Sequence, residues 1–379
     1  MSSKQTSLVV TAFRDHSFGI YASAILIAYL AFNLKFNDFD LGVWTFDYSH
    51  GFIKRGMAGE ILSTIIEKPY SNHDLANVFI FIYSIFAILL FYFLNLGALT
   101  KSTALALFAS GFMIQQIGYT VEKLDAILLV ISLAGLVVIH KLDIRYSMPV
   151  CTLLITTALL IHEASAMLVV PLIVSIFFIK ERASNNFPTM SGILLIISIF
   201  SFSTIYYLHG LTDVSQTILT EMGKAKIPTL TDDNLAFKIY NLSLIDNMNW
   251  ALERLHDPKT LTRTLLNIAA GLPFILLFVS FYLQLKDKSS WFWLPFIMVI
   301  GASACMYLLG IDFSRWNAWI MMNTTLFLTA SALILSCKLK TSRYIIIAAW
   351  IFLLWSGPFG ITISLPQRNS LIQSFIDIF

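Results

Sequence analysis

The stretch that decides the fold is MPVCTLLITTALLIHEASAMLVVPLIVSIFFI, residues 148–179. As one helix it would be about 48 Å long, too long for a hydrocarbon core of about 30 Å without a strong tilt. Basic residues precede and follow it, namely Lys141, Arg145, Lys180 and Arg182. Such residues favour the cytoplasmic side of a membrane, so both flanks are expected there and the number of passages is even. We therefore predict a short helical hairpin over 150–179, with helices at 150–161 and 165–179 that turn at His162 and Glu163.

The composition agrees with a polytopic membrane protein. The chain is 57% hydrophobic and 12% charged, and its mean hydropathy is +0.77, which lies outside the range of soluble globular domains. The alternating pattern of a membrane β-barrel is absent, so we predict an all-α fold, with residues 1–379 as a single integral membrane domain. With the hairpin, about eleven transmembrane helices are expected, the others near 18–34, 77–98, 103–119, 124–140, 190–208, 265–284, 291–309, 318–336 and 344–356.

The basic residues of the short connections predict the orientation in the membrane. These residues are Lys101, Lys141, Arg145, Lys180, Arg182, Lys286, Lys288, Lys338, Lys340 and Arg343. With these loops and the N-terminus on the cytoplasmic side, the two long segments 35–76 and 209–264 become outer loops. Apolar residues recur at helical spacing in both loops, which predicts amphipathic helices lying in the membrane interface.

Every unusual polar cluster falls on the predicted outer side, and these clusters form the candidate site: Asp38, Asp40, Lys54, Arg55, Glu60, Glu122, Asp125, His162, Glu163, Asp312 and Arg315. His162 and Glu163 are the most informative, because ionisable residues in the centre of an apolar run are costly and point to function. The alternative is a structural hydrogen bond that closes the hairpin.

The first outer loop offers two kinds of chemistry. Asp38 and Asp40 could supply a general base or hold a divalent metal ion such as Mg²⁺ or Mn²⁺, although a solvated acidic loop would look the same. Lys54 and Arg55 could bind phosphate, since arginine forms bidentate contacts with phosphate oxygens. Anchoring to lipid headgroups is the alternative for this basic pair.

Two further turns carry charges. Asp125 lies close to Glu122 and Lys123, and this group could be a self-neutralising turn. Asp312 and Arg315 are three residues apart, so at the start of a helix they would share a face and could pair with each other. Arg315 also precedes two tryptophans and would suit a phosphate at the interface, although interfacial aromatic residues also serve as anchors.

These features resemble those of the integral membrane glycosyltransferases of the GT-C type. The resemblance rests on about eleven predicted spans, an Asp-x-Asp pair near the first helix, a following interfacial helix and a long late loop. In that family an outer-loop aspartate acts as base or metal ligand and basic residues hold a polyprenyl phosphate, which by position implies Asp40, Arg55 and Arg315. The strings at residues 54–60, 162–163 and 312–316 are also similar to proteins of bacterial surface-polysaccharide clusters, including repeat-unit polymerases, some of which use arginines and no metal.

The resemblance implies an enzyme of the bacterial inner membrane with its active site on the periplasmic or extracellular face. It would transfer a sugar or oligosaccharide from a polyprenyl-linked donor to a glycan acceptor, in O-antigen or capsule assembly. The expected partners are this donor, the acceptor and membrane lipids, without nucleic acid. A flippase for lipid-linked sugars is the main alternative, but it should place ionisable residues near the midplane of the membrane. A membrane acyltransferase is a third possibility, because it would favour a histidine with a nearby acid.

Overall fold

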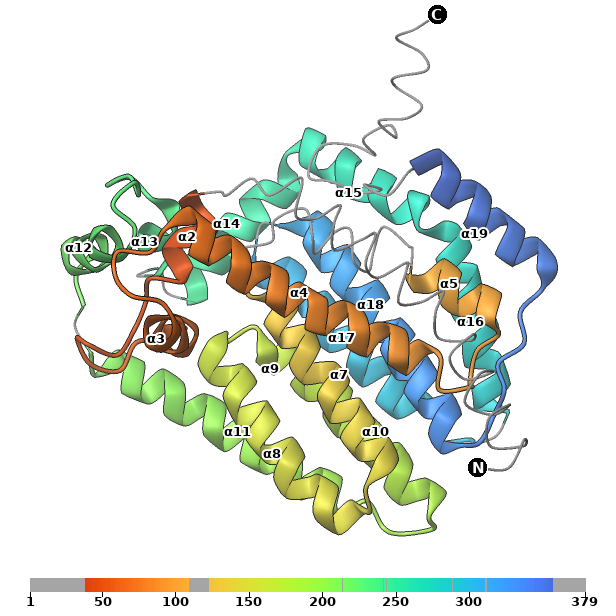
Figure 1. Cartoon of the computed structure of the whole chain (residues 1–379). Helices are drawn as coiled ribbons and strands as arrows, with labels where there is room; N and C mark the ends of the chain where they lie inside the picture. Colours follow the sequence, from red (N-terminus) through yellow and green to blue (C-terminus); the bar gives the residue numbers. More distant parts are fainter. Residues whose placement is uncertain are drawn as a thin grey trace, which may run out of the picture.

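The computed structural model describes residues 38–108, 123–212, 214–240, 242, 244–287, 289–310 and 312–356. Every regular element in these ranges is a helix, as predicted. The long helices lie side by side in one bundle (Figure 1). The predicted first span at 18–34 lies outside the described residues.

The predicted break at His162 and Glu163 is confirmed. Helix α8 (Ile144–Ile161) ends there, because the backbone of His162 is extended, with φ −158° and ψ 124°. The short helix α9 (Ser165–Leu168) and the longer α10 (Val170–Ala183) follow, with Pro171 in the first turn of α10. Helix α10 packs against α8 and against α7 (Asp125–Lys141), so the chain does turn back on itself.

Four helical stretches in the described part of the chain are long and apolar enough to cross a membrane. They are α4 (Asn72–Leu94), α8, α11 (Thr189–Gly210) and residues Arg315–Ile334 of α18 (Phe313–Ile334). Shorter apolar helices are α16 (Leu272–Lys286) and α17 (Trp293–Leu309). The chain is therefore consistent with a helical membrane protein, and the count of about eleven passages remains a prediction.

The other predicted spans differ in their ends. The span at 265–284 is divided at Gly271 between α15 (Pro258–Ala270) and α16. Helix α5 (Lys101–Phe108) begins the span expected at 103–119, whose remainder lies outside the described residues. Helix α19 (Arg343–Ser356) matches the last predicted span closely.

Helix α18 forms the centre of the bundle and α11 lies at its edge. In the apolar window of α18, 83% of the residues are buried, against 22% in that of α11. The interior face of α18 is partly polar: the amide of Asn323 donates to the carbonyl of Leu168 and to the hydroxyl of Ser303, each at 2.9 Å. An apolar helix with a largely exposed surface suits contact with lipid, whereas α18 is surrounded by protein.

The two ends of the bundle differ in character. At one end short connections are tied together: the ammonium of Lys180 donates to the carbonyls of Ile139 and Leu142, and the side chain of Gln284 bonds to the backbone of Lys340 at 2.8 and 2.9 Å. The segments from the two long loops gather at the other end, on the left of Figure 1. They are α2 (Asp38–Val43), α3 (Gly56–Ile65), α12 (Gln216–Lys226), α13 (Leu235–Tyr240) and α14 (Leu244–His256).

Candidate functional site at one end of the bundle

Two of the predicted site residues, Arg55 and Glu163, form an ion pair. The Nε atom of Arg55 lies 3.0 and 2.8 Å from the two carboxylate oxygens of Glu163, and Nη2 donates to Oε1 as well. Both side chains are largely buried. Such a forked, charge-assisted contact is among the stronger polar interactions in proteins. It joins the loop before α3 to the turn after α8.

The backbone of Arg55 is in the left-handed conformation, with φ 65°, directly before α3. This conformation costs a non-glycine residue roughly 1–2 kcal/mol. The ion pair with Glu163 is a contact that can offset this cost. The left-handed backbone of Arg55 and its ion pair with Glu163 therefore both fix the orientation of the guanidinium.

His162 completes this part of the site. Its Nδ1 lies 3.4 Å from Oε2 of Glu163, and it also accepts a hydrogen bond at 3.1 Å from the backbone N–H of Ala164. These two contacts compete, because a ring nitrogen that accepts a hydrogen bond carries no proton to give to a carboxylate. We favour the backbone bond, since it satisfies a buried N–H group and burial disfavours a charged imidazole. His162 is then neutral, and its Nε2 carries the proton.

A second ion pair lies between Asp125 and Arg315. The Nε of Arg315 is 2.6 Å from one oxygen of Asp125, Nη2 donates to the other at 2.8 Å, and the indole of Trp319 donates to the same oxygen at 2.9 Å. Asp125 is buried in the first turn of α7, where the helix dipole also favours a negative charge. The guanidinium of Arg315 lies 4.8 Å from the ring of Trp316. These contacts tie the start of α18 to the start of α7.

The expected pairing of Asp312 with Arg315 is not seen among the described residues. Asp312 bonds to Lys123 at 2.9 Å, while Arg315 bonds to Asp125. Lys123 and Asp125 each pair with a residue of the 312–315 turn, so these contacts connect two helices. Glu122 lies outside the described residues.

The Arg55–Glu163 pair and the Asp125–Arg315 pair interact electrostatically, because the charge of Arg315 acts on Arg55 and on His162. The fold thus brings together most of the predicted site residues from four separate segments. This cluster, which we call the charged site, contains Lys54, Arg55, Lys123, Asp125, His162, Glu163, Asp312 and Arg315.

Lys54 differs from the other cations of the charged site. It is only 8% exposed, and among the described residues no carboxylate lies within ion-pairing distance of it. Its ammonium lies 5.3 Å from the centre of the Tyr240 ring, a cation–π contact. Burial lowers the pKa of Lys54, an effect that the charge of Glu163 opposes and that of Arg55 strengthens.

Two residues of the site were missed by sequence reasoning. The hydroxyl of Tyr240 and the Nδ1 of His209 are 3.0 Å apart, and their rings meet edge to face with centroids 5.0 Å apart. The charges of Lys54, Arg55 and Glu163 all act on His209. His209 lies in the last turn of the apolar helix α11, and this position was the available signal.

A further buried ion pair, Asp47 with Lys226, joins the two long loops. The Oδ2 of Asp47 lies 2.5 Å from the ammonium of Lys226, which also donates to the carbonyl of Thr45 at 2.7 Å. The backbone N–H of Tyr70 donates to the carbonyl of Lys226 at 2.7 Å. Burial alone would raise the pKa of Asp47, but the bonds from Lys226 and Ser49 lower it to about 2. These contacts fix the first loop against α12.

Glu60 and the neighbouring glycines belong to this loop packing. The carboxylate of Glu60 accepts a hydrogen bond from the backbone N–H of Tyr48 at 3.2 Å. A Cβ atom at Gly59 would lie 2.1 Å from the carbonyl oxygen of Phe46 and 2.5 Å from that of Trp44. At Gly56 it would meet the ring of Tyr48 at 2.7 Å. The two glycines therefore allow close approach of the chain to itself.

Asp38 and Asp40 both lie on the short helix α2. Positions two apart on a helix lie on nearly opposite faces, so the backbone does not place these two positions on one face. Within the described residues no group of three or more histidine, cysteine, aspartate or glutamate side chains is arranged to hold a metal ion.

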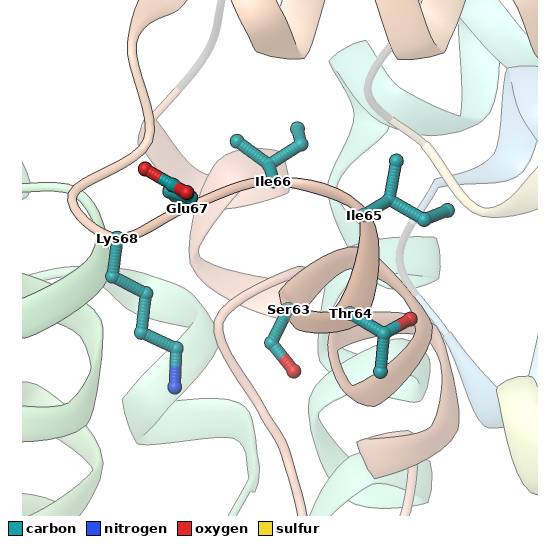
Figure 2. A pocket seen from close by; sticks show the side chains of 6 residues that line it. All are labelled: Ser63, Thr64, Ile65, Ile66, Glu67 and Lys68. Carbon is teal, nitrogen blue, oxygen red and sulfur yellow. The ribbon is translucent and has the colours of Figure 1, made fainter.

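An open pocket lies at the end of α3 and in the turn after it (Figure 2). It is lined by Ser63, Thr64, Ile65, Ile66, Glu67 and Lys68. None of the predicted site residues lines it, and we assign it no role. No protein-family model, curated protein or solved structure matches the chain.

Proposed function

We propose that the protein is a membrane enzyme that transfers a sugar or oligosaccharide from a polyprenyl-phosphate-linked or diphosphate-linked donor to an acceptor hydroxyl. The observation that carries this proposal is the charged site itself, which collects basic and acidic side chains from four segments at one end of an apolar helical bundle. A polyprenyl chain would lie against the apolar helices, while its phosphate would reach the basic side chains.

In this proposal the acceptor hydroxyl attacks the anomeric carbon of the donor. Glu163 takes the hydroxyl proton, and Asp40 is the alternative base. The bond between the anomeric carbon and the phosphate oxygen breaks, and its electron pair stays on that oxygen. Lys54 and Arg55 stabilise the resulting phosphate charge, with Arg315 adding positive potential through its place beside them.

Other members of the site have supporting roles in this scheme. The neutral His162 would orient the acceptor through its Nε2–H, because its Nδ1 is occupied by the backbone of Ala164. Asp125, Lys123 and Asp312 help to hold the start of α18 against the start of α7. The resemblance to GT-C enzymes and polysaccharide polymerases favours assembly of O-antigen or capsule at the outer face of a bacterial plasma membrane.

Mass spectrometry of polyprenol-linked glycans in the native host, with and without the gene, tests this function. Accumulation of a complete repeat unit without the gene would identify a polymerase, and accumulation of a unit short of one sugar would identify a monosaccharide transferase. An unchanged lipid-linked pool would contradict the proposal and favour transport or acyl transfer.

A further inference from the structure

We propose that Arg55 changes partners during the reaction: an anionic phosphate that enters beside Lys54 takes the guanidinium from Glu163 and leaves this carboxylate free beside His162. This inference rests on the proposed function and extends it, because it makes the base available only when the donor is bound. It is carried by three features of the charged site, namely its charge balance, the burial of Lys54 and the geometry of the Arg55–Glu163 pair.

Within the described part of the chain, the charge balance of the site leaves one positive charge without a carboxylate partner. Its basic members are Lys54, Arg55, Lys123 and Arg315, and its acidic members are Asp125, Glu163 and Asp312. Each of the three acids is paired with one of the last three basic residues. Among the described residues, the unmatched charge is that of Lys54.

Lys54 is a costly residue in this position. A buried ammonium without an anion loses much of its hydration, and a cation–π contact compensates for only part of this loss. The ring of Tyr240 and the more distant charge of Glu163 are its only described compensation. An anionic ligand at Lys54 would therefore be bound more tightly than at an exposed lysine, because it would remove an existing penalty.

A ligand at Lys54 would also lie within reach of Arg55, the next residue in the chain. The guanidinium fork matches a phosphate as well as it matches a carboxylate. Glu163 occupies the fork through Nε and Nη2, so ligand and Glu163 compete for the same donors. A phosphate with up to two negative charges would also be held by Lys54. It should therefore bind the guanidinium of Arg55 more strongly than a carboxylate with one negative charge does.

The exchange has a direct consequence for catalysis. A carboxylate held by an arginine fork is a poor base, because protonation would break the ion pair. Once released, Glu163 can form a bond to the proton of the acceptor hydroxyl while that oxygen bonds to the anomeric carbon and the phosphate leaves. Without a bound donor, the same carboxylate stays neutralised. The pair therefore couples donor binding to activation of the base.

The test is the binding of farnesyl phosphate to the purified full-length protein in lipid nanodiscs, measured by calorimetry. We expect Glu163→Gln to bind it roughly tenfold more tightly than the wild type, because the competitor for Arg55 is weakened. Lys54→Met should bind it roughly tenfold more weakly. The matched control Glu253→Gln makes the same change at an exposed position on α14 and should leave affinity unchanged. Equal or weaker binding by a folded Glu163→Gln variant would overturn the exchange.

A second measurement uses the wild type alone, so that it does not depend on the folding of a variant. Labelling of Glu163 by dicyclohexylcarbodiimide, mapped by peptide mass spectrometry, should rise several-fold when farnesyl phosphate is added, because the reagent adds to a protonated carboxyl and the bound arginine disfavours that form. Unchanged labelling at saturating ligand would contradict the release of the carboxylate. A parallel experiment with inorganic phosphate shows whether the site binds a free phosphate or a lipid phosphate. An equal rise in labelling would assign the site to free phosphate. A rise with farnesyl phosphate alone would assign it to a lipid phosphate. Both measurements report binding without turnover, so they test the exchange of partners separately from the transfer of a glycan. Either proposal can be contradicted while the other is supported.

Discussion

At the scale of single residues, the charged site consists of ionisable side chains whose partners come from distant segments of the chain. Ionisable groups at the ends of apolar segments are costly, and this cost alone singles out Arg55, Asp125, Glu163 and Arg315. Their actual partners lie more than a hundred residues away along the chain. Local spacing instead suggested a bond between Asp312 and Arg315, which would have been reasonable on an isolated helix.

The Asp47–Lys226 pair was missed for the same reason. Asp47 belongs to a loop and Lys226 ends α12, and nothing in the local pattern of either predicts that the two loops meet. The burial of both charges shows how much the fold depends on the contact, because each would be uncompensated without the other.

Replacing Asp47 by asparagine tests this contact. Breaking a buried ion pair by removing one partner costs about 3–5 kcal/mol, so Asp47→Asn should lower the free energy of unfolding at pH 7 by roughly that amount. The measurement is thermal unfolding of the protein in detergent. The control Asp233→Asn removes an exposed pair with Lys238 and should cost less than about 1 kcal/mol.

The same pair predicts a response to acid. The folded pKa of Asp47 is about 2, below its ordinary value of 3.8, so its ionised form stabilises the fold above pH 4. This contribution is lost as the pH falls from about 4 towards 2. The unfolding temperature of the wild type should therefore fall more steeply over this range than that of Asp47→Asn, and parallel curves would contradict the assignment.

At the scale of elements, the hairpin was the most secure prediction. A break was expected from the length of the apolar run, its basic flanks and its central His162–Glu163 pair. The break lies at these two polar residues. The sequence did not show that Asn323 from the central helix α18 would bond to the carbonyl of Leu168 beside this break. Such a bond depends on how three helices pack, which hydrophobic pattern alone does not specify.

The contact of α3 with the preceding loop gives a prediction at this scale. Gly59→Ala would place a Cβ about 2.1 Å from the carbonyl oxygen of Phe46, so the helix must move away from the loop. We expect a loss of roughly 2–3 kcal/mol in thermal unfolding in detergent, typical of overpacking against backbone. Gly192→Ala on α11 is the matched control, because nothing lies within 4 Å of its Cβ position. Equal effects of the two substitutions would show that α3 is free to shift.

At the scale of the whole molecule, the two ends of the bundle are expected on opposite sides of the membrane. Asp233 lies in the connection between α12 and α13, and Asn186 lies in the connection between α10 and α11. Figure 1 shows α12 and α13 at the charged-site end and the connection between α10 and α11 at the other end. In a background without the three native cysteines, a membrane-impermeant maleimide should label Asp233→Cys in intact cells and Asn186→Cys only after permeabilisation. The opposite pattern would place the charged site on the cytoplasmic side.

The charged site is proposed to transfer a lipid-linked glycan. The most direct measurement is the mass spectrum of polyprenol-linked glycans in a host that carries Glu163→Gln in place of the wild type, with Glu253→Gln as the control for the same substitution at an exposed position. We predict that the lipid-linked precursor accumulates with Glu163→Gln as it does without the gene, and that the control resembles the wild type. A wild-type glycan pool in cells that hold normal amounts of inserted Glu163→Gln protein would contradict the account.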